Sequence, residues 1–200
     1  AVGTGAGKGI GRAIAERFLA DNVAGVALLD MDEELVKAAA KELDPTGEKV
    51  LAVKCDVSNQ ENVNTAFTQV NAKFGRVDIL VNNAGVALIK QIQDITYEEY
   101  NRVMSVNMGG AFLCVREACK GMIAKKSGLI VNISSVWGEV GGSCESVYSA
   151  SKAGLLGFTK ALAKELGCDY FTTQMFFDNE IMYSFLAKFQ RKGINIPVIA

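Results

Sequence analysis

Two side chains in the C-terminal half have the spacing of a proton-transfer pair. Tyr148 and Lys152 are four residues apart, so a helix from about Tyr148 onward places both on one face. A free phenol has a pKa of about 10 and exchanges protons poorly near neutrality. An ammonium beside a phenol favours the phenolate, which makes tyrosine usable as a general acid and base. Ser135 could hold a substrate oxygen next to the phenol. The alternative interpretation is that Tyr148 and Lys152 belong to a solvent-exposed helix face and have no catalytic role.

The composition narrows the classes of protein to consider. The chain has 200 residues, enough for one domain with a proper core, and half of them are hydrophobic. The net charge of -1 gives no electrostatic reason to expect nucleic acid or an anionic membrane as a partner. No apolar run approaches the roughly twenty residues of a membrane span and no signal peptide is evident, so we expect a cytoplasmic protein.

Cysteine and histidine usage limits the possible catalysts. The five cysteines are odd in number and show no C-x-x-C pairing, which favours free thiols in a reducing cytoplasm. The chain has no histidine, so Ser-His-Asp and Cys-His catalysis is excluded. A zinc site would need thiolates or carboxylates alone, and we expect no metal.

A glycine-rich turn lies near the start of the chain. Glycines at positions 5, 9 and 11 precede an amphipathic helical pattern. Such a turn lets the backbone approach a phosphate closely, and the helix N-terminus adds amide donors and a positive dipole end. The continuous apolar run at 26–29 suits a buried parallel strand, and it ends in Asp30. That carboxylate could accept hydrogen bonds from a ribose, or cap the next helix at 32–43, or both.

Strands and helices alternate five times along the chain. Further strands are expected at 50–57, 77–81 and 128–134, with helices at 58–74 and 148–166 among those that follow. This pattern predicts an α/β fold, a doubly wound parallel sheet of the Rossmann type in three layers. Polar residues follow the strands, and parallel strands end at one edge of their sheet. We therefore expect these residues to share one crevice.

The motifs together resemble those of the short-chain dehydrogenase/reductase family. The matching elements are T-G-A-G-K-G-I-G at 4–11, C-D-V at 55–57, N-N-A-G at 82–85, Asn107, Ser135 and Tyr148-x-x-x-Lys152. The resemblance covers residues 1–167 and implies an NAD(H) or NADP(H) cofactor, with hydride transfer between an alcohol and a ketone.

The resemblance also implies a role for each matching residue. Tyr148 would exchange a proton with the substrate oxygen, and Lys152 would hold the cofactor ribose beside it. Ser135 would fix the substrate oxygen and Asn107 would support a water relay to Lys152. The other implied cofactor contacts are Thr4, Gly5, Lys8, Gly9, Ile10 and Gly11 in the turn, Asp30, Asp56 and Val57 after two strands, and Asn83, Ala84 and Gly85 after the fourth.

The choice between the two dinucleotides depends on two side chains. Asp30 would accept from a ribose 2′-hydroxyl and repel a 2′-phosphate, which favours NAD. Lys8 could instead contact a 2′-phosphate. We rank NAD first, because an unpaired carboxylate against a phosphate costs more than a flexible lysine gains.

Within the family, the chain most resembles bacterial 3-oxoacyl-acyl-carrier-protein reductases of fatty acid biosynthesis. The segment at 137–152 also resembles reductases of an aminopentanone modification on elongation factor P. Trp137, Cys144 and Glu145 could line a substrate entrance or could be loop packing. Family members commonly form dimers or tetramers through helices that correspond to 107–125 and 148–166, so we expect a homo-oligomer.

Both ends of the chain depart from the family pattern. Only three residues precede Thr4, so we expect the first strand to be nearly missing. Residues 168–200 form an atypical C-terminal segment, rich in aromatic residues and lacking the family's Pro-Gly turn. A helix at 181–192 and a strand at 194–199, a makeshift sixth strand, are expected there. Two hypotheses result: an active oxidoreductase, or a non-catalytic fragment that binds a dinucleotide or associates with full-length subunits.

Overall fold

A computed structural model of the chain describes residues 1–168, 171–172 and 198–199. They fall into two compact units, Ala1–Leu155 and Leu156–Ala200. The first unit contains every residue of the candidate site. In the second, β6 (Phe171–Thr172) pairs in parallel with β7 (Val198–Ile199).

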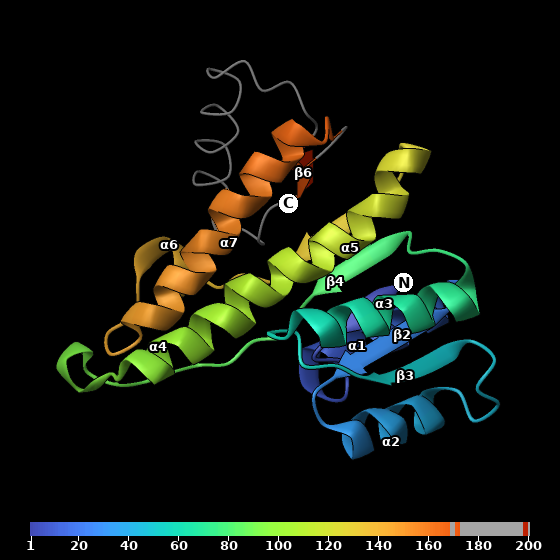
Figure 1. Cartoon of the computed structure of the whole chain (residues 1–200), viewed down its shortest axis with the longest axis horizontal. Coiled ribbons are helices and arrows are strands. Elements are labelled where there is room, and N and C mark those ends of the chain that lie inside the picture. Colours follow the sequence, from blue (N-terminus) through green and yellow to red (C-terminus); the bar gives the residue numbers. More distant parts are fainter. Residues whose placement is uncertain (169–170, 173–197, 200) are drawn as a thin grey trace. The chain divides into compact units, whose positions relative to one another are not determined.

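The first unit is built on a five-stranded parallel sheet, which confirms the predicted fold (Figure 1). Its strands are β1 (Val2–Thr4), β2 (Val26–Asp30), β3 (Val50–Lys54), β4 (Ile79–Asn82) and β5 (Leu129–Asn132). They lie in the order β3-β2-β1-β4-β5. The chain adds β2 and β3 on one side of β1 and then adds β4 and β5 on the other, so the strand order reverses between β1 and β4. Ligands of doubly wound sheets bind at such a reversal.

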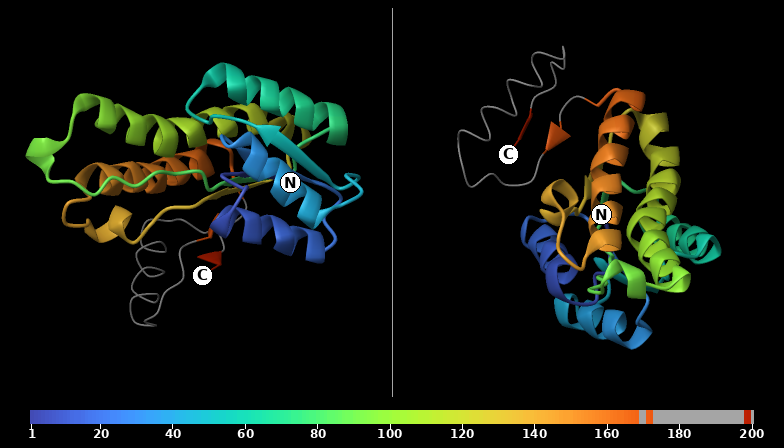
Figure 2. Two further views of the ribbon diagram at one scale, coloured as in Figure 1. Left: turned by 90° about the horizontal axis from the view of Figure 1, so that it is seen from below. Right: turned by 90° about the vertical axis from the view of Figure 1, so that its left-hand side faces the viewer.

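Helices cover both faces of this sheet (Figures 1 and 2). On one face, α1 (Gly9–Ala20) packs on β1 and β2, and α2 (Glu33–Leu43) packs on β2 and β3. On the other, α3 (Gln60–Phe74) packs on β3, and α5 (Gly110–Lys125) packs on β4. Because both faces are covered, β2 carries the apolar run V-A-L-L, every residue of which is buried.

The remaining elements surround the ends of β4 and β5. The 3-10 turn η1 (Ile92–Asp94) leads into α4 (Tyr97–Met104), a π-helical turn η2 (Ser105–Gly109) and then α5. The short helix α6 (Trp137–Val140) follows β5, and α7 (Ser146–Glu165) begins in the first unit. The structure thus adds α6 to the elements expected from the sequence. No helix in the described part of the chain is long and apolar enough to cross a membrane.

Side chains at the helix starts explain where the helices begin. Asp32 accepts a hydrogen bond from the backbone N–H of Leu35 at 3.0 Å and caps α2. The suggestion that Asp30 caps this helix is therefore wrong, because Asp30 ends β2 two residues earlier. Thr96 and Glu99 form a reciprocal capping box that fixes the start of α4.

The first strand is short but holds the centre of the sheet. Its three residues pair with β2, and Val2 and Gly3 also pair with β4, so that Gly3 lies beside both Leu28 and Val81. The first strand, expected to be nearly missing, is thus reduced to three residues but still pairs on both sides. The expected helix at 181–192 lies outside the described residues. The described part of the expected sixth strand, Val198–Ile199, pairs with β6 and not with the large sheet.

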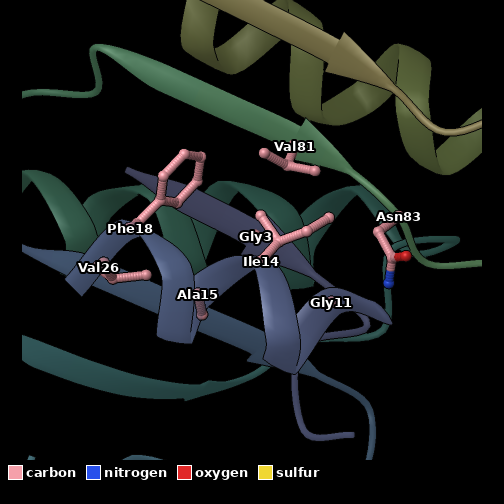
Figure 3. A pocket seen from close by; sticks show the side chains of 8 residues that line it. All are labelled: Gly3, Gly11, Ile14, Ala15, Phe18, Val26, Val81 and Asn83. Carbon is pink, nitrogen blue, oxygen red and sulfur yellow. The ribbon is translucent and has the colours of Figure 1, made fainter. Parts of the chain in front are cut away.

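A narrow apolar pocket lies between α1 and the central strands. Figure 3 shows that Ile14 and Phe18 of α1 face Val81 of β4 across it. The pocket leaves no room for a bound water molecule. We interpret it as a packing defect of the helix–sheet interface, because genuine ligand sites combine far more volume with convergent polar groups.

The turn after α2 supplies a test of stability. The Asp44 carboxylate accepts hydrogen bonds from Thr46 and from the backbone N–H groups of Lys49 and Val50, and these bonds lower its pKa to about 2. This stabilisation should be complete above the ordinary pKa of 3.8 and be lost as the pH falls towards 2.

We expect Asp44→Ala to be less stable than wild type at pH 7. Its unfolding free energy should also depend less on pH between about 4 and 2. Urea unfolding at a series of pH values measures both effects. Identical pH dependence in the two proteins would contradict the assigned role.

Candidate active site

The carboxyl ends of the five strands bring the predicted residues to one edge of the sheet. The glycine turn follows β1, and Asp30 ends β2. Asp56 follows β3, Asn83 follows β4 and Ser135 follows β5. Parallel pairing of every neighbouring pair places these ends on the same side. The predicted convergence of the polar residues is therefore found in the fold.

The glycine turn needs glycine at two kinds of position. Gly5 and Gly9 have left-handed backbone conformations, with φ of 60° and 56°, which strain any other L residue. Gly11 lies so close to the turn that a Cβ would come within 2.4 Å of the carbonyl oxygen of Gly5. Lys8 precedes α1 and offers no side-chain cap. The first amide groups of α1 are thus left without a side-chain acceptor, as an anion site at a helix N-terminus requires.

Four hydrogen bonds join the segment after β4 to the glycine turn. The side-chain amide of Asn83 donates to the carbonyl oxygens of Thr4 and Gly5 at 3.0 and 3.1 Å. The hydroxyl of Thr4 accepts from the backbone N–H groups of Asn83 and Ala84, both at 3.0 Å. Thr4 is buried and its hydroxyl is used inside the protein. Thr4 would therefore affect a bound ligand by fixing the shape of the turn.

Asp30 also braces the glycine turn. One carboxylate oxygen accepts from the backbone N–H of Gly7 at 2.9 Å, and the other from that of Asp32 at 3.1 Å. A Cβ on Gly7 would lie 3.0 Å from the carboxylate, so the two groups are in close contact. The side chain expected to face a ribose thus lies directly against the loop expected to hold the phosphates.

The residues after β3 have separate functions. Asp56 accepts from the backbone N–H and the hydroxyl of Ser58, at 2.9 and 2.7 Å, and so shapes the turn before α3. Val57 is buried, and its side chain fills the space that a Cβ on Gly110 would occupy. Val57 therefore positions the start of α5 against the strand end.

Lys152 is the buried cation of the site. Its side chain is only 4% exposed, and its Nζ donates to the carbonyl oxygen of Ile133 at 2.7 Å. Burial lowers the pKa of this ammonium. The same Nζ lies 5.7 Å from the centre of the Tyr148 ring, one helical turn earlier. The predicted pair therefore exists on one face of α7, in a setting where the ammonium is largely shielded from water.

The side chain of Asn107 is held by three hydrogen bonds. It is 1% exposed, and its side-chain oxygen accepts from Val86 N–H at 2.8 Å. Its side-chain nitrogen donates to the carbonyl oxygen of Val86 at 3.0 Å and to the hydroxyl of Ser151 at 2.9 Å, which in turn donates to the carbonyl oxygen of Tyr148. It lies in the π-helical turn η2, a feature frequent at functional sites.

Ser135 lies three residues after the end of β5 and two residues before the start of α6. Its hydroxyl accepts a weak hydrogen bond from the backbone N–H of Trp137 at 3.3 Å, so the hydroxyl proton is available for another acceptor. Trp137 and Cys144 are exposed, and Glu145 is half-buried.

Sequence reasoning did not identify the residues that hold this pair in place. Ser134 donates to the carbonyl oxygen of Lys152 at 2.9 Å, and a Cβ on Gly138 would come within 2.8 Å of the same backbone. Ser151 links Asn107 to α7. The one sequence feature that could have pointed to Ser134 is the pair of adjacent serines after β5, and the sequence analysis gives a role to Ser135 alone.

The described residues contain no group of ligands suited to a metal ion. Burial raises the pKa of Cys55 to about 11 and that of Cys114 to about 12, so these thiols stay protonated near neutrality.

Comparison with known proteins identifies the family. The short chain dehydrogenase model matches residues 1–173. The chain belongs to the short-chain dehydrogenase family. A 3-oxoacyl-[acyl-carrier-protein] reductase of Synechocystis is 34% identical over 98% of this chain and 77% of its own length. A reductase of the same name from Aquifex aeolicus is 41% identical over 82% of this chain and 66% of its own length.

Solved structures of the short-chain dehydrogenase family agree with the fold. A metagenomic short-chain oxidoreductase in complex with NADP superposes with a TM-score of 0.78 at 37% identity. The match covers 83% of this chain and 75% of that one. A short-chain dehydrogenase of Streptomyces avermitilis gives a TM-score of 0.77 at 32% identity, with coverages of 83% and 60%. The chain thus spans between 60% and 77% of the lengths of these relatives.

The family consists of NAD(P)-dependent oxidoreductases, and the site fits a dinucleotide. The glycine turn is open at Gly9, where a Cβ would meet nothing within 4 Å, and this cradle lies at the N-terminus of α1. A Cβ on Gly85 would lie 3.3 Å from the side-chain oxygen of Asn107 and 3.5 Å from Lys152 Nζ, so glycine brings this segment close to both side chains.

We expect Gly11→Ala to lower dinucleotide affinity at least tenfold. The added methyl group meets backbone, which must move and would widen the cradle. The misfit should also destabilise the fold by about 1–3 kcal/mol. Gly121→Ala is the matched control, because Gly121 lies within α5 with open space around its Cβ position. Fluorescence titration gives both affinities, and equal affinities would contradict the cradle.

Proposed function

We propose that this chain reduces a 3-oxoacyl thioester to the 3-hydroxyacyl thioester with a reduced nicotinamide dinucleotide. The observation that carries the proposal is the buried Lys152, whose Nζ lies 5.7 Å from the Tyr148 ring within a frame fixed by Asn107. The names of the Synechocystis and Aquifex relatives support the thioester as substrate.

In this proposal Tyr148 gives its phenolic proton to the substrate oxygen as the carbonyl becomes an alcohol. Lys152 stabilises the resulting phenolate, because a shielded ammonium acts strongly on a neighbouring anion. Ser135 donates to the same substrate oxygen and fixes its position. When bound, the reduced nicotinamide supplies the hydride that the carbonyl carbon accepts.

The remaining residues hold the dinucleotide or restore the proton. The glycine turn, with Lys8 and Ile10 at the start of α1, would face the pyrophosphate. Asp30 would face the adenosine ribose, Asp56 and Val57 the adenine, and Asn83 to Gly85 the nicotinamide half. Asn107 would keep a route for water to Lys152 open, because it fixes Val86, which follows Gly85, and the Cβ position of Gly85 lies 3.5 Å from Lys152 Nζ.

We further propose that NAD(H) is preferred to NADP(H). The Asp30 carboxylate would lie where a 2′-phosphate must go, and Lys8 is its only basic neighbour in the glycine turn. The metagenomic relative was solved with NADP, so the opposite preference also occurs among similar chains.

The Asp30→Asn variant tests this preference. Asparagine still offers an oxygen to the N–H of Gly7 but removes the charge. We expect the ratio of the two dissociation constants, NADPH over NADH, to fall about tenfold, equivalent to about 1.4 kcal/mol. An unchanged ratio would show that the carboxylate does not decide the preference.

A titration followed by a turnover assay tests the proposed reaction. The chain should bind a reduced dinucleotide and then oxidise it only when an acetoacetyl thioester is added. Binding without turnover would favour the second candidate, a non-catalytic fragment that binds a dinucleotide.

Two finer points complete the proposal. A reductase of an aminopentanone modification on a protein is the alternative substrate class, and a competition between the two substrates separates them. We also propose a homo-oligomer, a dimer or tetramer, for which the half-exposed Phe112 on α5 offers an apolar contact. Sedimentation measures the oligomeric state directly.

A further inference from the structure

One hydroxyl in the core of the first unit has no part in the reaction proposed above. Ser151 is 0% exposed and lies on α7, directly before Lys152. Its hydroxyl donates to the carbonyl oxygen of Tyr148 at 2.7 Å and accepts from the side-chain nitrogen of Asn107 at 2.9 Å. Because Ser151 is fully buried, it can act on a substrate only through the residues that it contacts.

The hydrogen bonds around Asn107 determine which way its side-chain amide faces. A backbone N–H can only donate, so that of Val86 selects the amide oxygen, at 2.8 Å. The hydroxyl proton of Ser151 is used on the carbonyl oxygen of Tyr148, so towards Asn107 this hydroxyl offers only a lone pair and selects the amide nitrogen. If the amide were turned over, two N–H donors would face each other at Val86. Ser151 and Val86 thus impose the same orientation from opposite sides.

The oriented amide joins two segments that approach Lys152 from different elements. Val86 belongs to the segment after β4, in which the Cβ position of Gly85 lies 3.3 Å from the Asn107 oxygen and 3.5 Å from Lys152 Nζ. Ser151 belongs to α7 and precedes Lys152 in the chain. A single side chain, that of Asn107, therefore spaces the segment after β4 from the helix that carries the buried ammonium.

The hydroxyl of Ser151 is not needed to form α7. Alanine has a higher helix propensity than serine, so Ser151→Ala would favour the helix. The same change would take the acceptor away from an N–H group of Asn107, which is 1% exposed, and a buried donor without its acceptor is costly. The contact with Asn107 therefore explains a serine at this position better than helix formation does.

We propose that Ser151 is a positioning residue that acts on the reaction through Asn107. The proposal rests on the proposed function, in which Asn107 keeps a route for water to Lys152 open. Ser151 would hold the amide nitrogen of Asn107 so that this route keeps its shape. Loss of the hydroxyl should slow the passage of a proton from water through Lys152 to the Tyr148 phenolate. Binding of the dinucleotide and of the thioester should stay unchanged.

A double-mutant cycle in kcat tests this dependence on Asn107. Ser151→Ala should lower kcat for acetoacetyl thioester reduction about tenfold, equivalent to about 1.4 kcal/mol. KM and the dinucleotide dissociation constant should stay within about twofold of wild type. In a chain that already carries Asn107→Ala, the same change should lower kcat by less than about twofold.

Ser149→Ala is the matched control for this cycle. Ser149 is also buried on α7, but its hydroxyl accepts from the backbone N–H of Gly142 at 3.0 Å. Any effect of Ser149→Ala on kcat should therefore be the same with and without Asn107→Ala. A general loosening of the helix would instead give Ser149 and Ser151 the same coupling to Asn107.

Urea unfolding gives the same cycle without any turnover. Ser151→Ala should lower the urea midpoint of wild type, and it should lower that of Asn107→Ala by less. Ser151→Cys keeps a weak acceptor and should lie between wild type and Ser151→Ala in both kcat and urea midpoint. The cysteine variant replaces the alanine variant in the cycle if the latter does not fold.

Two results would overturn the proposal. One is a fall in kcat from Ser151→Ala that is equally large with and without Asn107→Ala. The other is a change in KM alone, which would assign Ser151 to substrate binding. Failure of the proposed function looks different, because wild type would then reduce no acetoacetyl thioester while the urea midpoints still show the coupling. Additive urea midpoints would refute the contact between Ser151 and Asn107 whatever the substrate.

Discussion

Replacing Tyr148 with phenylalanine is expected to lower kcat for acetoacetyl thioester reduction by about 10²–10⁴-fold, the usual contribution of a positioned general acid. The change removes one hydroxyl and keeps the ring that lies beside Lys152. Dinucleotide affinity should therefore stay close to that of wild type. Stopped-flow kinetics and a parallel titration measure the two quantities in one preparation.

Tyr97→Phe is the matched control for this variant. Tyr97 lies on α4 and is 72% exposed, so loss of its hydroxyl should leave both quantities unchanged. Turnover by Tyr148→Phe at the wild-type rate would mean that another group protonates the substrate. A fall in dinucleotide affinity equal to the fall in rate would instead assign Tyr148 to binding.

Replacing Lys152 with methionine should also lower kcat by at least about 10²-fold, because the phenolate then forms without a neighbouring cation. Dinucleotide affinity should fall as well, which distinguishes this variant from Tyr148→Phe. Lys160→Met is the control, since Lys160 is on the same helix and is exposed. Equal kinetics of Lys152→Met and Lys160→Met would contradict the assigned role of the buried ammonium.

The same variant tests the burial of Lys152 through stability. Because the pKa of Lys152 is lowered in the folded protein, the unfolded chain binds this proton more tightly. The free energy of unfolding of wild type, relative to Lys152→Met, should therefore rise as the pH approaches the ordinary value of 10.5. Urea unfolding between pH 7 and pH 10 measures this difference. A parallel pH dependence of the two proteins would mean that the ammonium is solvated.

The fold could be predicted from the sequence because its signals are local. A strand buried on both faces must be apolar throughout, as V-A-L-L of β2 is, and the polar residue after it must lie at the sheet edge. The helical spacing of Tyr148 and Lys152 likewise determines that they share a face. These two rules were enough to bring the strand ends and the proton-transfer pair to one crevice.

The parts that could not be predicted depend on contacts between distant segments. Ser134 reaches the backbone of Lys152, and Asp30 reaches the backbone of Gly7. When a side chain hydrogen-bonds to a backbone group, the residue that supplies this group can be of any type, because every residue has one. The identity of that residue therefore does not reveal the contact. The π-helical turn around Asn107 is hidden for the same reason, because its extra residue does not disturb the apolar pattern of α5.

The first strand shows how a short segment can be underestimated. Three residues gave too little pattern to predict a strand by periodicity. Their partners decide the outcome, because β2 and β4 lie on either side and supply the hydrogen bonds. The alternation of strands along the chain was therefore a better guide than the length of any one of them.

A single-turnover experiment tests the central claim most directly. Enzyme in excess over a reduced dinucleotide is mixed with acetoacetyl pantetheine, and the products are quantified by mass spectrometry. The proposed chemistry predicts one 3-hydroxybutyryl thioester for each dinucleotide oxidised by wild type, and almost none on the same timescale with Tyr148→Phe. Bound dinucleotide that stays reduced in the wild-type protein, or equal product from both proteins, would contradict it.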